Sequence, residues 1–251
     1  MLIRDIMDFL LPPTCVVCGR RLTTKENSVC TMCLGNVEQT NYHLSSPNAL
    51  ERIFWGNISI DKAVAFMYYN KEVSRRIMMS NKYLSHPDVG YHIASMYAET
   101  LKKTDFFQGI DFIVPVPISW RRAWKRRYNQ SEYIARGVSD VTGLPLRTDI
   151  VKKVVHTKSQ TSLRHSERMA NISDAYKLVR PEAAHGKHIL LIDDVVTTGS
   201  TLVSCAKEIQ KAGDVTFSIL ALAHASSHII PPSPDGFIDS SLYGLPIPPD
   251  L

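Results

Sequence analysis

The sequence lacks any uninterrupted stretch of about eighteen uncharged apolar residues, which excludes a predicted membrane span. Its start has acids at Asp5 and Asp8 within an apolar stretch and no small-residue cleavage site, unlike a secretory signal. With 44% hydrophobic and 21% charged residues, the composition is also unlike that of a disordered chain. We therefore expect a folded, cytoplasmic protein whose 251 residues form one full-sized domain with a smaller appendage.

Cysteine is scarce, but four of the five cysteines fall within nineteen residues. They form two Cys-x-x-Cys pairs, Cys15 with Cys18 and Cys30 with Cys33. Zinc prefers four soft ligands in a tetrahedron, and two such pairs supply four thiolates and leave no open coordination position. Two disulfides are the alternative, but they belong to oxidising compartments. The pattern predicts a structural zinc ribbon, and the separate Cys205 is expected to be a small buried residue.

Strand patterns alternate with helix patterns, which predicts an α/β domain with a mostly parallel sheet. Strands are expected at 63–69, 111–117, 188–194 and 215–223. Helices are expected at 2–11, 71–80, 90–103, 131–143 and 202–213. The polar run 156–174 is expected to be a long loop, and loops of that length are usually functional or disordered. The proline-rich last 21 residues are expected to form an irregular tail. In such a sheet, ligands sit at the carboxyl ends of the strands.

Acidic residues are few between 121 and 170, where twelve Lys or Arg against four Asp or Glu give a net charge of +8. The whole chain carries +5, so the other 201 residues together carry −3. The densest part is a run of five cations: Arg121, Arg122, Lys125, Arg126 and Arg127. Such a block indicates a negatively charged partner, either a phosphorylated small molecule or nucleic acid. A solvated helix face is the alternative.

One segment has the features of a phosphate site. The apolar strand predicted at 188–194 ends in Asp193 and Asp194, whose carboxylates are placed to accept hydrogen bonds from neighbouring sugar hydroxyls. A turn into a helix follows: Val195, Val196, Thr197, Thr198, Gly199, Ser200 and Thr201. Unpaired N–H groups at a helix start favour an anion, and Gly199 permits close approach of the backbone. The segment lacks the P-loop lysine and the spaced Rossmann glycines, and a plain helix N-cap is the alternative.

Residues 190–201, LLIDDVVTTGST, resemble the phosphoribosyl-diphosphate (PRPP) signature of type I phosphoribosyltransferases. The wider sequence is similar to the competence protein F (ComF) family, the zinc-ribbon branch of that superfamily. The similar segments are FLLPPTCVVCG, RRIMMSNKY, IVPVPIS, RRYNQSEYIA and TKSQTSLRHSERMANISDAY. One departure is Arg126-Arg127-Tyr128-Asn129-Gln130, where the family usually shows Arg-Gly-Phe-Asn-Gln.

The resemblance implies a type I phosphoribosyltransferase fold with an N-terminal zinc ribbon of four cysteines. It divides the chain into a ribbon and hood-like segment (1–60), a phosphoribosyltransferase-like domain (61–228) and a Pro-rich tail (229–251). It also implies that Asp193 and Asp194 hold the ribose hydroxyls of PRPP and that the turn 197–201 binds its 5′-phosphate. Magnesium would accompany the diphosphate, whose side of the site would hold Pro115, Val116 and Pro117. The loop 156–174 matches a flap, in which the positions of interest are Gln160, Arg164, Arg168 and Asn171, with the two arginines expected to be catalytic.

Two function classes remain open. The first is a magnesium-dependent phosphoribosyltransferase, in which a nucleophile displaces pyrophosphate at C1 of PRPP. The second is a non-catalytic module that binds single-stranded DNA during natural transformation, with competence machinery as its partner and a regulatory or vestigial PRPP pocket. Purine salvage is a weaker third option, because no acceptor-site sequence supports it. The aromatic residues Phe54, Trp55, Trp120, Trp124 and Tyr128 could stack on bases, although burial in the core is the favoured expectation for each.

Overall fold

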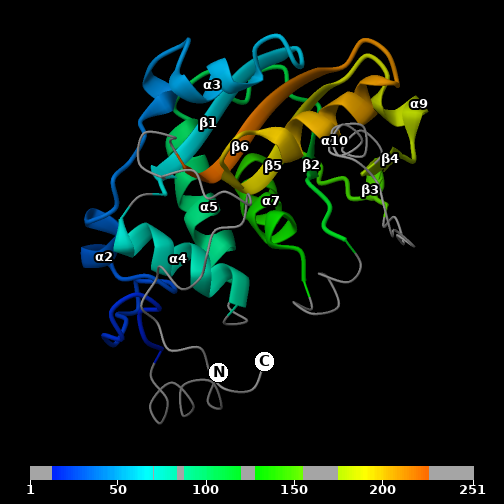
Figure 1. The fold of residues 1–251 in the computed structure, drawn as a ribbon. Helices are drawn as coiled ribbons and strands as arrows, with labels where there is room; N and C mark the ends of the chain where they lie inside the picture. The colour runs from blue at the N-terminus through cyan, green and yellow to red at the C-terminus, as the bar shows by residue number, and fades with distance from the viewer. Residues whose placement is uncertain (1–12, 70, 84–87, 120–127, 155–174, 226–251) are drawn as a thin grey trace, which may run out of the picture.

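The computed structural model describes residues 13–69, 71–83, 88–119, 128–154 and 175–225. Its main feature is a four-stranded parallel sheet (Figure 1). In spatial order the strands are β1 (Ile60–Tyr68), β6 (Thr216–His224), β5 (His188–Val196) and β2 (Phe112–Pro115). Residues 38–40 extend the β1 edge in the antiparallel direction, since Thr40 N–H donates to the Phe66 carbonyl at 3.1 Å. The predicted mostly parallel sheet is therefore confirmed.

Helices cover both faces of this sheet, which is why β5 and β6 are apolar along most of their length (Figure 1). One face carries α3 (Ala49–Phe54) and α10 (Ser200–Gln210), and Ala63 and Ala65 of β1 belong to its core. The other face carries α4 (Glu72–Tyr83), α5 (Asp88–Leu101) and α7 (Gln130–Thr142), and Val64 and Phe66 belong to its core. Alternate residues of one strand thus serve two different cores.

A two-stranded antiparallel sheet lies outside the main one. It pairs β3 (Val151–Lys153) with β4 (Tyr176–Leu178), and both strands contact α10. The remaining short elements are α2 (Thr31–Gly35), η1 (Tyr42–Leu44) and α9 (Pro181–Ala184). Within the described ranges, no helix combines the length and the apolar composition that a membrane crossing requires.

The long elements agree with the sequence-based expectations in type and place. The strands predicted at 63–69, 111–117, 188–194 and 215–223 correspond to β1, β2, β5 and β6, and the four helices predicted from 71 onwards correspond to α4, α5, α7 and α10. Gly143 ends α7 in the left-handed conformation, with φ 75°. The short elements α2, η1, α3, β3, β4 and α9 were not predicted. The helix at 2–11, the tail at 229–251 and the loop at 156–174 lie outside the described residues.

Candidate functional site

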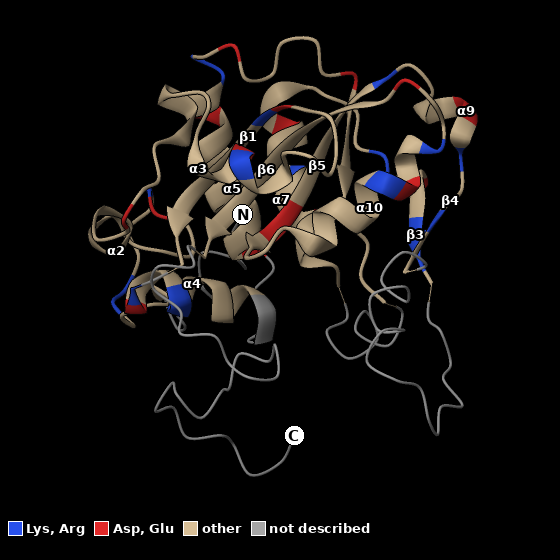
Figure 2. Ribbon diagram, turned by 45° about the horizontal axis from the view of Figure 1, so that its top comes forward, with Lys and Arg blue, Asp and Glu red and all other residues tan. Residues whose placement is uncertain are grey.

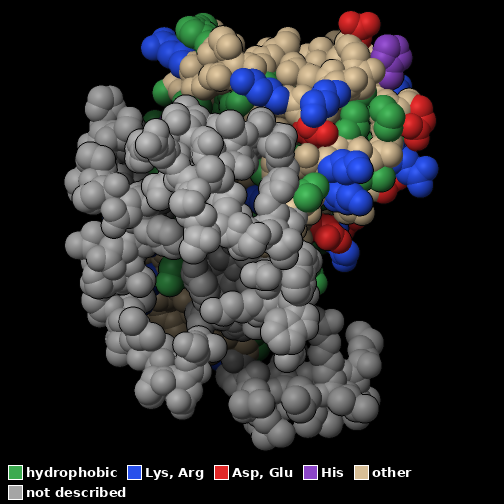
Figure 3. All heavy atoms as spheres, turned by 45° about the vertical axis from the view of Figure 1, so that its right-hand side comes forward, with side chains coloured by type: hydrophobic (Ala, Val, Ile, Leu, Met, Phe, Trp, Pro, Cys, Tyr) green, Lys and Arg blue, Asp and Glu red, His purple; other side chains and the backbone are tan. Residues whose placement is uncertain are grey.

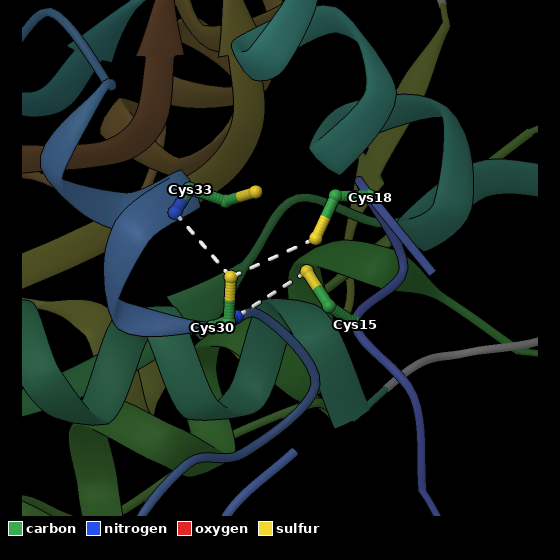
Figure 4. A group of neighbouring side chains, drawn as sticks. All are labelled: Cys15, Cys18, Cys30 and Cys33. Atoms are coloured by element: carbon green, nitrogen blue, oxygen red, sulfur yellow. Dashed lines mark hydrogen bonds between the residues drawn. The ribbon is translucent and has the colours of Figure 1, made fainter. Parts of the chain in front are cut away.

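The four clustered cysteines converge on one point from two turns (Figure 4). The Sγ atoms of Cys15, Cys18, Cys30 and Cys33 all lie within 4.8 Å of one another. The distance between Cys18 Sγ and Cys30 Sγ is 3.8 Å, which is the edge of a sulfur tetrahedron with Zn–S bonds of about 2.3 Å. All four are free thiols in the structure, an arrangement that favours a metal site over two disulfides. The donor set fits a closed, structural zinc site.

Backbone N–H groups donate hydrogen bonds to two sulfur atoms of the cluster, Cys15 Sγ and Cys30 Sγ. Cys30 N–H donates to Cys15 Sγ at 3.3 Å, and Cys33 N–H donates to Cys30 Sγ at 3.5 Å. Burial alone would raise the pKa of Cys30, but the Cys33 N–H and the Arg20 side chain lower it to about 6. The thiolate of Cys30, which is the form that binds metal, is therefore favoured without an ion, whereas burial and the neighbouring cysteines raise the pKa of Cys33.

A single carboxylate joins the two cysteine turns. Glu26 accepts hydrogen bonds from Arg20 Nη2 at 2.7 Å, Thr23 N–H at 2.9 Å and Thr31 N–H at 2.8 Å. The backbone donors of Thr23 and Thr31 are the main causes that lower the pKa of Glu26 to about 2. Glu26 thus remains charged near neutral pH and fixes the spacing between the first Cys pair and the second.

The ribbon is attached to the main domain by apolar and polar contacts. Cys15, Val29 and Cys30 are buried in the same core as α5 and α7. Arg76 of α4 donates from Nη1 to the Val17 carbonyl at 3.1 Å. Loss of the ribbon would therefore also expose part of the domain core.

The end of β5 borders an open cleft of about 600 Å³. The Val116 N–H donates to the Ile192 carbonyl at 2.9 Å, so the residues after β2 lie directly beside the residues that end β5. We call this the acidic cleft; it is lined by Val116, Pro117, Ile118, Gln130, Ser131, Lys153, Tyr176, Asp193, Asp194, Val195 and Thr201.

Local hydrogen bonds fix the two carboxylates of the acidic cleft. Asp193 Oδ1 accepts from Ser131 Oγ at 3.0 Å and from the Asp194 N–H at 2.9 Å. Asp194 Oδ1 accepts from the Val195 N–H at 2.7 Å. Ser131 lies in the first turn of α7, and Asn129 before it donates from Nδ2 to the Val116 carbonyl at 3.1 Å. The start of α7, the end of β2 and the end of β5 thus form one wall.

A smaller hollow of about 190 Å³ follows at the start of α10. We call it the phosphate cup; it is lined by Asp193, Val195, Val196, Thr197, Gly199, Ser200, Thr201 and Leu202. The N-cap residue is Gly199, which has no side chain to cap the helix, and the Ser200 N–H reaches Thr198 Oγ1 only at 3.5 Å. The N-cap residue itself therefore satisfies none of the N–H groups that begin α10 through a side chain, which suits an anion at this helix start.

Helix α3 fixes the backbone of the phosphate cup. Gly199 has φ 71°, and a Cβ atom added there would lie 2.7 Å from Ile53 Cγ2 and 3.0 Å from Phe54 Cε1. Glycine is required both by the left-handed backbone and by this close approach. Phe54 itself is fully buried, as expected for a core residue, whereas Trp55 is 56% exposed, so burial was the wrong expectation there.

A buried Tyr–His pair supports the cup from the side of β6. His224 is paired with Val196 in the sheet, and its Nδ1 lies 2.8 Å from the hydroxyl of Tyr42. Burial lowers the pKa of His224 and raises that of Tyr42. Both groups are therefore neutral near pH 7, and they join the segment after the ribbon to β6, which lies beside the strand that leads into the cup.

The acidic cleft and the phosphate cup share Asp193, Val195 and Thr201, so they form one continuous site. Among the residues predicted from sequence, Pro115 and Thr198 line neither hollow; Pro115 is buried and paired with Ile192. The others in 116–117 and 193–201 line one or both. The predicted flap residues Gln160, Arg164, Arg168 and Asn171 lie outside the described residues, as do Arg121, Arg122, Lys125, Arg126 and Arg127.

Four polar residues of the acidic cleft were not predicted as site residues: Gln130, Ser131, Lys153 and Tyr176. The first two belong to the RRYNQSEYIA segment, so the motif that carries the family resemblance also carries part of the site. Tyr176 ends another segment of the resemblance, TKSQTSLRHSERMANISDAY, whereas nothing in the local pattern distinguishes Lys153 from other lysines.

Comparisons with known proteins find a zinc ribbon family and several similar proteins. The double zinc ribbon domain family matches residues 6–44. Competence protein F of Haemophilus influenzae is 28% identical over 222 residues, which cover 84% of this chain and 96% of that protein. The DNA utilization protein YhgH of Salmonella typhi is 33% identical over 112 residues, covering 45% of this chain and 48% of that protein. Competence protein ComFC of Bacillus subtilis is 30% identical over 107 residues, covering 41% of each chain.

Solved phosphoribosyltransferases are among the similar structures. The allosteric regulatory enzyme of purine biosynthesis has a TM-score of 0.39 and 19% identity, and the match covers 57% of this chain and 30% of that one. The purine phosphoribosyltransferase from Pyrococcus horikoshii has a TM-score of 0.33 and 13% identity, and the match covers 53% of this chain and 81% of that one. The chain thus spans nearly the whole of the Haemophilus protein but about half of YhgH and less than a third of the first enzyme.

Proposed function

This chain is a homologue of competence protein F, ComFC and YhgH, and we propose that it is a phosphoribosyltransferase that displaces pyrophosphate at C1 of PRPP. The observation that carries the proposal is the continuity of the phosphate cup with the acidic cleft through Asp193. This continuity supports the proposal, because a helix start suits a phosphate and the neighbouring carboxylates suit ribose hydroxyls.

Each part of the site has a role in this proposal. The 5′-phosphate of PRPP binds in the phosphate cup, at the N–H groups that begin α10. Asp193 and Asp194 accept hydrogen bonds from the ribose 2′- and 3′-hydroxyls, and Ser131 holds Asp193 in place. The diphosphate occupies the acidic cleft beside Val116 and Pro117. Magnesium, a hard cation that prefers oxygen ligands, would accompany the diphosphate in the acidic cleft and would offset the charge on it.

The bond changes at C1 are those of a substitution. A nucleophile, either a base nitrogen or an amine, forms a bond to C1 while the C1–O bond breaks, and pyrophosphate leaves with the electron pair. Water must be excluded, because it would hydrolyse the oxocarbenium-like transition state. Arg164 and Arg168, in the segment proposed as a flap, would contact the leaving diphosphate.

Calorimetry with PRPP in the presence of Mg²⁺ tests the binding step, and pyrophosphate release with a panel of bases and amines tests turnover. We expect binding that EDTA abolishes, and pyrophosphate release with at least one acceptor. Absence of PRPP binding would refute the proposed ligand. Binding without release for any acceptor would leave a PRPP-binding protein and refute the transferase activity.

A second function is favoured by the charge distribution and by the name of one relative, the DNA utilization protein YhgH. We propose that the run Arg121, Arg122, Lys125, Arg126 and Arg127 binds the backbone of single-stranded DNA. On the described surface in Figure 3, Lys and Arg side chains lie among Asp and Glu side chains. Several cations of the described residues are in ion pairs, including Arg147 with Asp149 and Lys187 with Asp111. The cationic run, by contrast, contains no acid over seven residues.

Changing the five cations of this run to Ala is expected to weaken single-stranded DNA binding and to make its salt dependence shallower. The slope of log affinity against log salt should fall by about 0.7 for each phosphate that the variant no longer neutralises. Fluorescence anisotropy on labelled oligonucleotides measures both quantities. An unchanged slope contradicts the DNA interface, and a fall in PRPP affinity instead would assign the run to the pyrophosphate side of the pocket.

A further inference from the structure

The β3–β4 hairpin presents two different faces. Lys152 is directly opposite Lys177, and Lys153 is directly opposite Tyr176. Opposite residues in an antiparallel pair lie on the same face, and successive residues alternate between faces. Lys152 and Lys177 are exposed, whereas Tyr176 is only 4% exposed. Basic residues lie on both strands of the hairpin (Figure 2). Adjacent lysines in the sequence are therefore directed to opposite sides of the hairpin.

The inner lysine is held at the acidic cleft by its cross-strand partner. Lys153 Nζ donates to the Tyr176 hydroxyl at 3.2 Å and lies 4.9 Å from the centroid of the Tyr176 ring. The ring is buried in the core beneath α10, so it is a rigid support for the ammonium group. Lys153 and Tyr176 both line the acidic cleft, and neither of them lines the phosphate cup.

Lys153 and the two acids line the same cleft from different elements. Asp193 and Asp194 lie at the end of β5, and Lys153 lies on the β3–β4 hairpin. The acidic cleft therefore has a negative wall at the end of β5 and a cation on the hairpin.

We propose that Lys153, positioned by Tyr176, binds the phosphate groups on the C1 side of the ligand, so that the site selects a pentose phosphorylated at both ends. The inference rests on the proposed function, because the phosphate cup must take the 5′-phosphate first. With the sugar on Asp193 and Asp194, the rest of the ligand extends into the acidic cleft, where Lys153 supplies a counter-charge. A ribose phosphorylated only at C5 would use the cup and the two acids but not this lysine.

The test compares two ligands in matched lysine variants. Lys153→Met keeps the aliphatic stem and removes the charge, Lys153→Arg restores a cation, and Lys152→Met removes the adjacent charge on the outer face. Calorimetry with PRPP and Mg²⁺, and separately with ribose 5-phosphate, gives the affinities. For Lys153→Met we expect PRPP affinity to fall by about 10-fold or more, as for removal of a charge-assisted hydrogen bond, with ribose 5-phosphate affinity within about twofold of wild type.

The controls separate a direct role in ligand binding from a structural role. Lys152→Met should bind both ligands as wild type does, and Lys153→Arg should recover most of the PRPP affinity. Tyr176→Phe keeps the ring and loses the hydroxyl, so it should weaken PRPP binding less than Lys153→Met and leave ribose 5-phosphate binding unchanged. Equal PRPP affinity in wild type and Lys153→Met, or equal loss for both ligands, overturns the inference while leaving the proposed function standing. If wild type binds neither ligand, the proposed function itself fails.

Discussion

Replacing both carboxylates at the end of β5, as Asp193→Asn with Asp194→Asn, is expected to abolish magnesium-dependent PRPP binding while the protein stays folded. Hydrogen bonds to charged groups contribute about 1.5–3 kcal/mol each, so losing two of them weakens binding by roughly 10²- to 10⁴-fold. Asparagine retains the Oδ1 atom that accepts from the Ser131 hydroxyl and the Asp194 N–H, so the local fold is preserved. Calorimetry on the double variant measures the loss.

The matched control is Asp214→Asn. Asp214 is exposed in the turn before β6. It therefore lies at the amino end of the parallel strands, opposite the carboxyl end that holds the site. Its φ of 52° is a left-handed conformation that asparagine also adopts readily. This variant should bind PRPP as wild type does, and thermal unfolding of both variants should remain close to that of wild type. Wild-type affinity in the double variant would show that the two acids do not contact the ligand.

The parts of the fold that could be predicted from sequence are the elements whose own run of residues shows which side chains are buried. β5 reads as a strand because Ile189 to Ile192 are all buried between two helical layers, and the two acids mark the point where that burial ends. The hairpin β3–β4 could not be predicted, because each strand has three residues and a burial pattern that alternates only once. β3 pairs with β4 across a long polar run. The residue pattern within either strand does not show which distant segment it pairs with.

The same distinction holds for the candidate site. Asp193 and the turn through Thr201 are consecutive in sequence, so their chemistry could be recognised as one segment. Ser131 and Lys153 reach the acidic cleft from α7 and β3, which are placed there by the order of strands in the sheet and by packing against α10. Their residue types are common ones, and only the three-dimensional contact with Asp193 or with the cleft identifies them.

Loss of one zinc ligand is expected to destabilise more of the protein than the ribbon. We expect one zinc per chain, and Cys30→Ser should remove it, because a closed tetrahedral site has no spare ligand. Structural zinc sites contribute about 10–16 kcal/mol of binding energy to folding, far more than a single core contact. Since Cys15, Val29 and Cys30 are buried in the core that α5 and α7 share, we also expect Tm of the whole domain to fall.

Elemental analysis gives the zinc stoichiometry, and thermal unfolding gives Tm. Cys205→Ala is the matched control, because Cys205 is a fully buried thiol on α10 that lies outside the four-cysteine cluster. That variant should keep one zinc per chain and lose only the small stability that comes from removing one buried sulfur. Wild-type protein without zinc, or with two disulfides by mass spectrometry, would contradict the zinc site. Zinc retained in Cys30→Ser would show that the ribbon binds metal with a different ligand set.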